Sequence, residues 1–153
     1  MAILAAGGIT MKVKDIMSSH VIKINPEESV AVAARTLAHY NIGILPVCGA
    51  DGSVQGLVTD RDLVIRCIAS GKSPQQTKVR DVMTGNIVAA APDMEIGALA
   101  SMMGRKQIRR LPVVEKGRLC GMVSLGDVAA REETVYDAGD ALAEISNNIL
   151  NNG

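Results

Sequence analysis

The sequence predicts a mixed α/β (α+β) fold built from two copies of one unit, each with the order strand, helix, strand, strand, helix. Three observations support this prediction. The chain contains an internal repeat, each copy combines short β-prone runs with a helical pattern, and a turn signal falls at the same place in both copies. With 153 residues, 48% of them hydrophobic, the chain can bury an ordinary core without disulfide or metal support.

The internal repeat is carried by short sequences that recur in one order and at a constant offset, which shortens by a single residue between the two strands of a predicted hairpin. Matches of this number and order do not arise by chance. The corresponding pairs are Val13-Lys14-Asp15-Ile16-Met17 with Val79-Arg80-Asp81-Val82-Met83, Pro26 with Pro92, Leu45-Pro46-Val47 with Leu111-Pro112-Val113, Gly56-Leu57-Val58-Thr59 with Gly121-Met122-Val123-Ser124, and Asp62 with Asp127.

Each copy opens with a short β-prone run followed by a helical pattern. The first run, Val21–Ile24, is closed by Asn25-Pro26, and its counterpart is Ile87-Val88. Apolar residues then recur at the i, i+3, i+4, i+7 spacing of one helix face. These positions are Val30, Ala33, Ala34 and Leu37 in the first copy, and Ile96, Leu99, Ala100 and Met103 in the second.

Two apolar runs joined by a glycine-containing turn follow each of these helices, which predicts a hairpin. A second helix begins where the hairpin ends, at Thr59 in the first copy and at Ser124 in the second. The paired runs are Ile44–Cys48 with Val54–Val58 around Asp51-Gly52, and Leu111–Val114 with Leu119–Val123 around Lys116-Gly117.

These elements divide the chain into five segments. We expect an N-terminal extension over 1–11, a first repeat over 12–70, a polar linker over 71–77, a second repeat over 78–131 and a helical tail over 132–153. In the tail, Ala138, Leu142, Ile145 and Ile149 follow roughly helical spacing. Such a helix either packs on its own domain or mediates self-association, and the sequence leaves both open.

Composition excludes several classes of protein. Lysine and arginine (16) balance aspartate and glutamate (16), and the only aromatic residues are Tyr40 and Tyr136, so neither phosphate neutralisation nor base stacking is available for nucleic-acid binding. No apolar run approaches the roughly 18 residues that cross a membrane.

The three cysteines form no CxxC pair, and the first ten residues lack a basic signal-peptide region. We therefore expect a cytoplasmic protein with reduced thiols and no metal site.

Signals of catalysis are missing from the sequence. Its only histidines, His20 and His39, lie in unrelated positions, and there is no P-loop, GxGxxG or HExxH motif. The nearest approach to a serine nucleophile elbow, Met122–Gly126, lacks the first glycine. We therefore expect a protein that is not an enzyme.

The recurring element Gly-h-h-(Thr/Ser)-x-x-Asp, where h is apolar, ends at Asp62 and at Asp127. Two interpretations fit it. In the structural one the hydroxyl caps a helix and the carboxylate reaches back to the first backbone N–H. In the functional one the helix start receives a phosphate and the carboxylate accepts hydrogen bonds from a ribose diol. Glutamate, the usual residue in such caps, is absent from both copies, which favours the functional interpretation slightly.

The ordered, doubled motifs resemble a tandem pair of CBS domains, the Bateman module, over about residues 12–131. The resemblance implies that the repeats pack about a pseudo-twofold axis and leave two clefts between them. In the family these clefts bind adenosine-containing ligands such as AMP, ADP, ATP, NAD(H) or S-adenosylmethionine. It also implies a homodimer, for which the sequence offers the apolar helix faces near 60–69 and 125–131.

By this resemblance, Asp62 and Asp127 would hold the ribose hydroxyls, and Thr59 and Ser124 would meet ribose or phosphate. The adenine pockets would be lined by Val21 and Lys23 with Ile44 and Pro46 in one copy, and by Ile87 and Ala89 with Arg110 and Pro112 in the other.

The chain also departs from the family pattern. Family members often carry threonine at the positions of Lys23 and Ala89. Arg109-Arg110 is either a polyphosphate clamp or a solvated face, and Arg61 could supply the cation in the first copy. We expect the two sites to differ in affinity or in phosphate preference.

Three functions are compatible with these observations. The first is a non-catalytic regulatory module that requires no cofactor, senses an adenine nucleotide and acts through oligomerisation or a separate effector protein. The second is an interaction protein with vestigial clefts, which the intact Asp62 and Asp127 argue against. The third is a metal or redox sensor that uses Cys48, Cys67 and Cys120 with the histidines.

Overall fold

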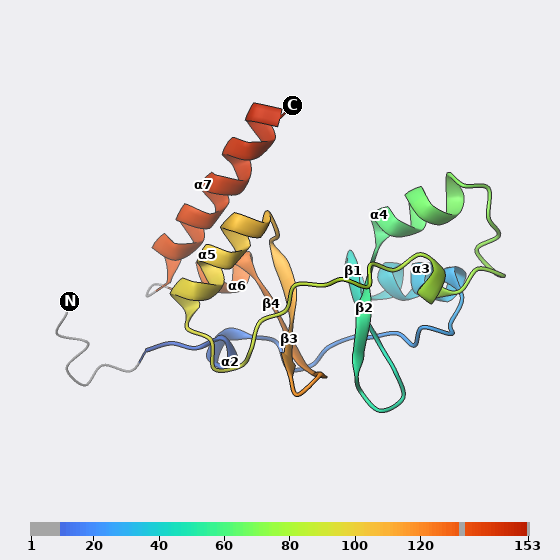
Figure 1. Ribbon diagram of the computed structural model, residues 1–153, viewed down its shortest axis with the longest axis horizontal. Helices are drawn as coiled ribbons and strands as arrows, with labels where there is room; N and C mark the ends of the chain where they lie inside the picture. The colour runs from blue at the N-terminus through green and yellow to red at the C-terminus, as the bar shows by residue number, and fades with distance from the viewer. Residues whose placement is uncertain (1–9, 132–133, 153) are drawn as a thin grey trace. The chain divides into compact units, whose positions relative to one another are not determined.

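The computed structural model describes residues 10–131 and 134–152, which divide into two compact units. Unit 1 contains residues 10–19, 89–115 and 120–152 within these limits, and unit 2 contains residues 20–88 and 116–119. Each unit holds a two-stranded antiparallel hairpin with helices beside it (Figure 1). The predicted α+β class is confirmed.

Unit 2 contains the main elements of the first repeat together with the 3-10 turn that opens the second repeat. They are α3 (Val30–Tyr40), β1 (Ile44–Cys48), β2 (Val54–Thr59), α4 (Asp60–Leu63), the π-helical turn η1 (Val64–Ile68) and the 3-10 turn η2 (Val79–Asp81). Ser29 caps α3 by accepting a hydrogen bond from the N–H of Val32, and Asn41 ends it in the left-handed conformation. The predicted hairpin is confirmed, with Ile44 opposite Thr59.

Unit 1 contains the corresponding elements of the second repeat, the short helix that opens the first repeat and the helix of the tail. They are α2 (Val13–Ile16), α5 (Ile96–Lys106), β3 (Arg110–Glu115), β4 (Arg118–Ser124), α6 (Leu125–Ala129) and α7 (Val135–Asn152). The turn residues 116–119, which include the start of β4, cluster with unit 2. In that turn Lys116 and Gly117 both have positive φ, as a two-residue hairpin loop requires.

The prediction of a first strand in each repeat is wrong. In its place, the structure has a single residue that forms one isolated β-bridge. Ile24 donates its N–H to the carbonyl of Pro46 at 3.0 Å and accepts the N–H of Cys48 at 2.9 Å. Ala90, rather than Ile87-Val88, makes the same parallel bridge in the second repeat. On its C-terminal side the pairing cannot extend further, because a turn containing a proline follows at once and proline has no N–H to donate.

The segment that opens each repeat in sequence packs against the other repeat. In unit 1, the N–H of Val13 donates to the carbonyl of Met94, and Ser18 bridges Met122 of β4. In unit 2, Val79 donates to Glu28 and Thr84 bridges Leu57 of β2. The sequence repeats and the compact units therefore do not coincide.

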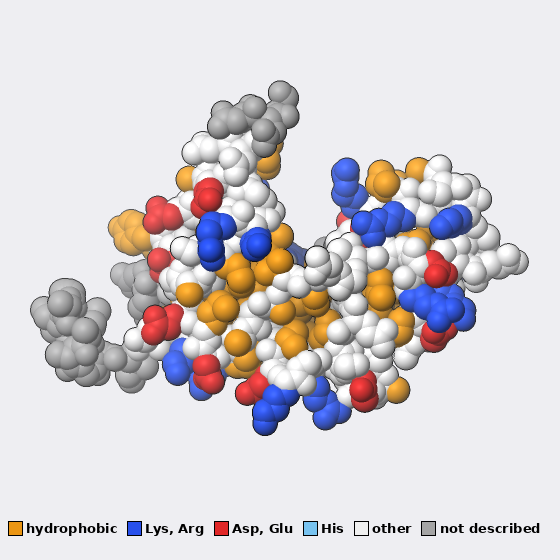
Figure 2. Space-filling view, in the orientation of Figure 1, with side chains coloured by type: hydrophobic (Ala, Val, Ile, Leu, Met, Phe, Trp, Pro, Cys, Tyr) orange, Lys and Arg blue, Asp and Glu red, His pale blue; other side chains and the backbone are white. Residues whose placement is uncertain are grey.

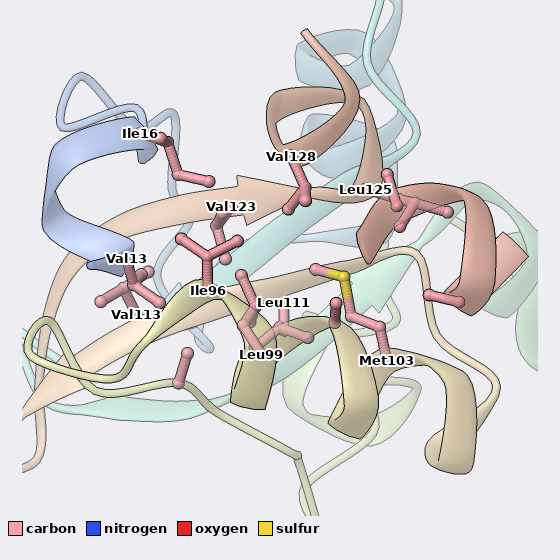
Figure 3. Close-up of a cluster of buried hydrophobic side chains, with 14 of the residues drawn as sticks. Val13, Ile16, Ile96, Leu99, Met103, Leu111, Val113, Val123, Leu125 and Val128 are labelled. Carbon is pink, nitrogen blue, oxygen red and sulfur yellow. The ribbon is translucent and has the colours of Figure 1, made fainter. Parts of the chain in front are cut away.

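Each unit has its own hydrophobic core. In unit 1, α2, α5, the hairpin and α6 contribute the cluster shown in Figure 3, to which α7 adds Ala138, Ala141 and Ile145. The C-terminal helix thus packs on its own unit, whereas Leu142 and Ile149 remain exposed. In α3 of unit 2, Ala31 is buried and Ala34 is exposed, so the predicted core face was wrong at Ala34.

Candidate functional site

The two Gly-h-h-(Thr/Ser)-x-x-Asp motifs fold into the same reciprocal capping box. In unit 2, the Oγ1 of Thr59 accepts the N–H of Asp62 at 3.1 Å, and Oδ2 of Asp62 accepts the N–H of Thr59 at 3.0 Å. In unit 1, Ser124 and Asp127 make the same pair of bonds at 3.1 and 2.8 Å. The structural interpretation of the motif is therefore confirmed in both copies.

The cap uses only part of each carboxylate. Oδ1 of Asp62 lies 3.9 Å from Nε of Arg66, and the Asp62 side chain is 14% exposed. Oδ1 of Asp127 has no partner among the described residues, and this side chain is also half-buried. Because an ionised carboxylate can accept about four hydrogen bonds, capping leaves both aspartates able to accept more.

The first glycine of each motif allows a neighbouring backbone to approach closely. A Cβ at Gly56 would lie 2.5 Å from the carbonyl oxygen of Thr84, and one at Gly121 would lie 2.7 Å from that of Ser18. Both glycines are buried in their strands beside the bridges made by these partners. Glycine is needed here for strand pairing, which holds the hairpin that leads into the capping box.

In unit 2 the structure brings only some of the other predicted residues to the capping box. Ile44 is the ladder partner of Thr59, and the N–H of Asp60 donates to the carbonyl of Gly43 at 3.1 Å. The carbonyl of the buried Pro46 already accepts from Ile24. The remaining predicted positions of this unit are Val21 and Ile87, which are half-buried, and Lys23 and Arg61, which are exposed.

In unit 1 the corresponding residues are split between two places. Arg110 at the start of β3 and Ser124 line one pocket with a volume of about 430 Å³. Pro112, Ala89 and Asp127 do not line it. Pro112 is buried, and its carbonyl accepts the N–H of Ala90. This carbonyl therefore already has a hydrogen-bond partner, as the carbonyl of Pro46 does in unit 2.

The pocket also contains residues that were not predicted from the sequence to form a site. One wall is a stripe of α7, from which Val135, Ala138, Gly139 and Leu142 face the pocket, and Gly126 and Ala129 come from α6. The helical spacing of the tail was visible in the sequence. Nothing in the sequence indicated that this stripe would lie opposite Ser124.

Arg109 and Arg110 carry the positive charge of this pocket. Neither guanidinium forms an ion pair with a carboxylate among the described residues, and both side chains are exposed. The backbone of Arg109 is fixed to the helix start, because its carbonyl accepts the N–H of Leu125 at 2.7 Å. Two cations with no acidic partner suit an anion.

The cysteines and histidines do not assemble a metal site in the part of the chain that the structure describes. Cys48 and Cys67 are buried and Cys120 is half-buried. Burial raises the pKa of the Cys48 thiol, while the charge of Lys23 acts in the opposite direction. None of the described helices is long and apolar enough to cross a membrane.

Comparison with known proteins identifies both repeats. Residues 13–68 and 79–134 each match the CBS domain. The CBS domain-containing protein YhcV of Bacillus subtilis is 37% identical over 88% of this chain and 94% of its own length. A crystal structure of Hypoxic Response Protein I with two coordinated zinc ions has a TM-score of 0.73 and 31% identity, covering 79% of this chain and 98% of that one.

A hexameric CBS-CP12 protein from bloom-forming cyanobacteria has a TM-score of 0.70 and 25% identity, over 84% of this chain and 75% of that chain. The resemblance predicted from the motifs is thereby confirmed on independent grounds. The chain belongs to the CBS-domain family and consists of a tandem CBS pair.

Proposed function

We propose that this CBS pair is a cytoplasmic, non-catalytic sensor that binds an adenosine-containing ligand, such as AMP, ADP, ATP, NAD(H) or S-adenosylmethionine. The observation that carries the proposal is the pair of half-buried aspartates, Asp62 and Asp127. Each is held rigidly by a capping box and keeps acceptor capacity to spare. Two adjacent acceptor sites on a fixed carboxylate match the two donors of a ribose diol.

The two sites of this proposal differ in their cations. Arg109 and Arg110 flank Ser124, whereas the equivalent positions beside Thr59 are Gly43 and Ile44. Arginine binds phosphate oxygens with two parallel hydrogen bonds. The site of the second repeat should therefore prefer ligands with more phosphate groups.

We also propose that the protein forms a homodimer through unit 2. Of the two helix faces suggested by the sequence, Leu125 and Val128 of α6 are buried within their own unit. Val64, Ile65 and Ile68, by contrast, are about half exposed. Hydrophobic and basic side chains lie together over α4 and η1 in Figure 2. An exposed apolar patch of this kind is typical of protein interfaces.

Light scattering on Ile68→Glu tests this surface. The parent protein should have the mass of a dimer, and the variant should have the mass of a monomer. Leu142→Glu, on an exposed position of α7, is the matched control and should leave the dimer intact. An unchanged mass for Ile68→Glu would exclude this surface.

A thermal-shift panel with AMP, ADP, ATP, NADH and S-adenosylmethionine tests ligand binding. A ligand at about a hundredfold above its Kd adds roughly 2.7 kcal/mol of stability, enough to raise Tm by several degrees. Asp62→Ala and Asp127→Ala are measured against their own unliganded Tm, because both lose part of a cap. A shift that disappears with one aspartate identifies the site. A panel with no shift in the parent protein would instead favour an interaction protein with vestigial clefts.

The zinc ions of Hypoxic Response Protein I do not extend to the proposal for this chain. No group of three or more histidine, cysteine or acidic side chains among the described residues could hold a metal. Binding of a nucleotide remains the function that the capped aspartates support best.

A further inference from the structure

The pocket beneath α7 combines an apolar wall with two unpaired cations. We propose that it is a second binding site, which adjoins the proposed nucleotide site of the second repeat and shares its cations, and that it takes a small amphiphilic anion: a carboxylate or phosphate group on an apolar body. Its volume of about 430 Å³ lies within the range of roughly 300–1,000 Å³ that is usual for small-molecule sites. The site shares Arg109, Arg110 and Ser124 with the proposed nucleotide site, but it does not include Asp127 and adds the apolar wall of α7.

The apolar part of the site is built by one stripe of α7. The side chains of Val135 and Leu142 are 40% and 42% exposed, and Ala138 and Gly139 lie between them on the same stripe. The carboxylates of α7 lie elsewhere: Asp137, Asp140 and Glu144 border α5. The pocket side of α7 is therefore apolar along two turns, and covering it with a ligand would remove apolar surface from water.

Gly139 keeps this wall open. A glycine inside an α-helix costs about 0.5–1 kcal/mol relative to alanine. Nothing lies within 4 Å of a Cβ built at Gly139, so packing within the protein does not require this glycine. A side chain at position 139 would enter the space that the pocket provides. A glycine that is unfavourable for the helix and unnecessary for packing is consistent with room kept for a ligand.

The anionic part of the ligand is selected by Arg109 and Arg110. These guanidinium groups lie at the start of β3, where the pocket meets α6, and no described carboxylate neutralises them. An uncharged ligand would leave them as they are, whereas a carboxylate or phosphate would gain charge-assisted hydrogen bonds.

The first repeat provides an internal comparison. Gly43 and Ile44 replace the two arginines there, and a polar linker follows where the second repeat continues into α7. Neither the cations nor the wall is part of the shared CBS scaffold. The site is accordingly a feature of the second repeat and of the tail.

The fluorescent probe 8-anilinonaphthalene-1-sulfonate tests this site, because it is itself a small anion with an apolar body. We expect saturable binding to the full-length protein, displacement by decanoate and by decyl phosphate, and much weaker displacement by uncharged decanol. Gly139→Leu should fill the pocket and weaken binding at least tenfold, about 1.4 kcal/mol. Arg109→Gln should weaken decanoate more than decanol.

Two controls separate this proposal from the proposed function. Ala143→Leu places the same side chain on an exposed position of α7 outside the pocket and should leave probe binding unchanged. Asp127→Ala should abolish a nucleotide response of the second repeat and retain the probe. The proposal is overturned if the parent shows no saturable binding, if Gly139→Leu binds like the parent, or if Asp127→Ala loses the probe.

Discussion

Unit 1 and unit 2 repeat one local design and differ in what surrounds it. Both have a hairpin joined to a parallel bridge, a glycine that admits a neighbouring backbone, and a capping box ending in a half-buried aspartate. Unit 1 adds α7 and two arginines, whereas unit 2 leaves the apolar residues of η1 exposed. The repeated parts hold the backbone in place, and under the proposed function the parts that differ would determine which ligand each unit binds.

The largest effect should come from equivalent leucines in the two cores. Leu45 and Leu111 are both buried at corresponding places in β1 and β3. Replacement of either by alanine should lower the free energy of unfolding by about 2.7–5 kcal/mol, because it removes contacts and leaves a cavity. Urea denaturation followed by circular dichroism measures the loss. A cost below about 1 kcal/mol at one leucine would show that the two cores are not equivalent.

The next effect tests how α7, which only unit 1 possesses, packs on that unit. Ile145 is 4% exposed and Ile149 is 60% exposed on the same helix. Ile145→Ala should cost about 2–4 kcal/mol of unfolding free energy, whereas Ile149→Ala should stay within about 0.5 kcal/mol. Equal effects of the two substitutions would contradict the packing of α7 on unit 1.

A smaller effect tests the close approach at the motif glycines. Gly56→Ala and Gly121→Ala each push a Cβ onto a backbone carbonyl and should cost about 1–3 kcal/mol. Gly139→Ala, in open space, should stabilise the protein by about 0.5–1 kcal/mol through helix propensity. Thermal unfolding of the three variants measures both signs. A neutral Gly56→Ala or Gly121→Ala would show that the neighbouring segments yield.

The smallest effect concerns the capping hydroxyls. Thr59→Ala and Ser124→Ala should each cost about 1 kcal/mol, since each leaves a backbone N–H without its side-chain acceptor. Thr59→Ser keeps the acceptor and should restore most of the stability. Equal losses in the two units would support the view that the cap is shared and that specificity lies outside it.

Most of the local design could be predicted from the sequence. The repeat, the hairpins, the long helices and the caps at Thr59 and Ser124 follow from period, turn residues and motif spacing, which are local signals. The first strand was overestimated, because β propensity at Val21–Ile24 does not reveal that a single residue pairs.

The non-local features could not be predicted in this way. No local pattern tells that Val13 packs with the second repeat and Val79 with the first. The exposure of Ala34 in α3, against the burial of its counterpart Ala100 in α5, depends on α7, which only unit 1 possesses. The pocket wall on α7 escaped prediction for the same reason, since it depends on where a distant helix docks.

Calorimetric titration of ATP and AMP into Asp62→Ala and Asp127→Ala is the most direct test of the central claim, that one repeated scaffold supports two different nucleotide sites. The Asp62→Ala protein keeps the second-repeat site with Arg109 and Arg110, and it should bind ATP at least tenfold more tightly than AMP, a difference of about 1.4 kcal/mol. The Asp127→Ala protein should discriminate less. The same ATP-to-AMP ratio in both variants, or no binding by either, would contradict the account.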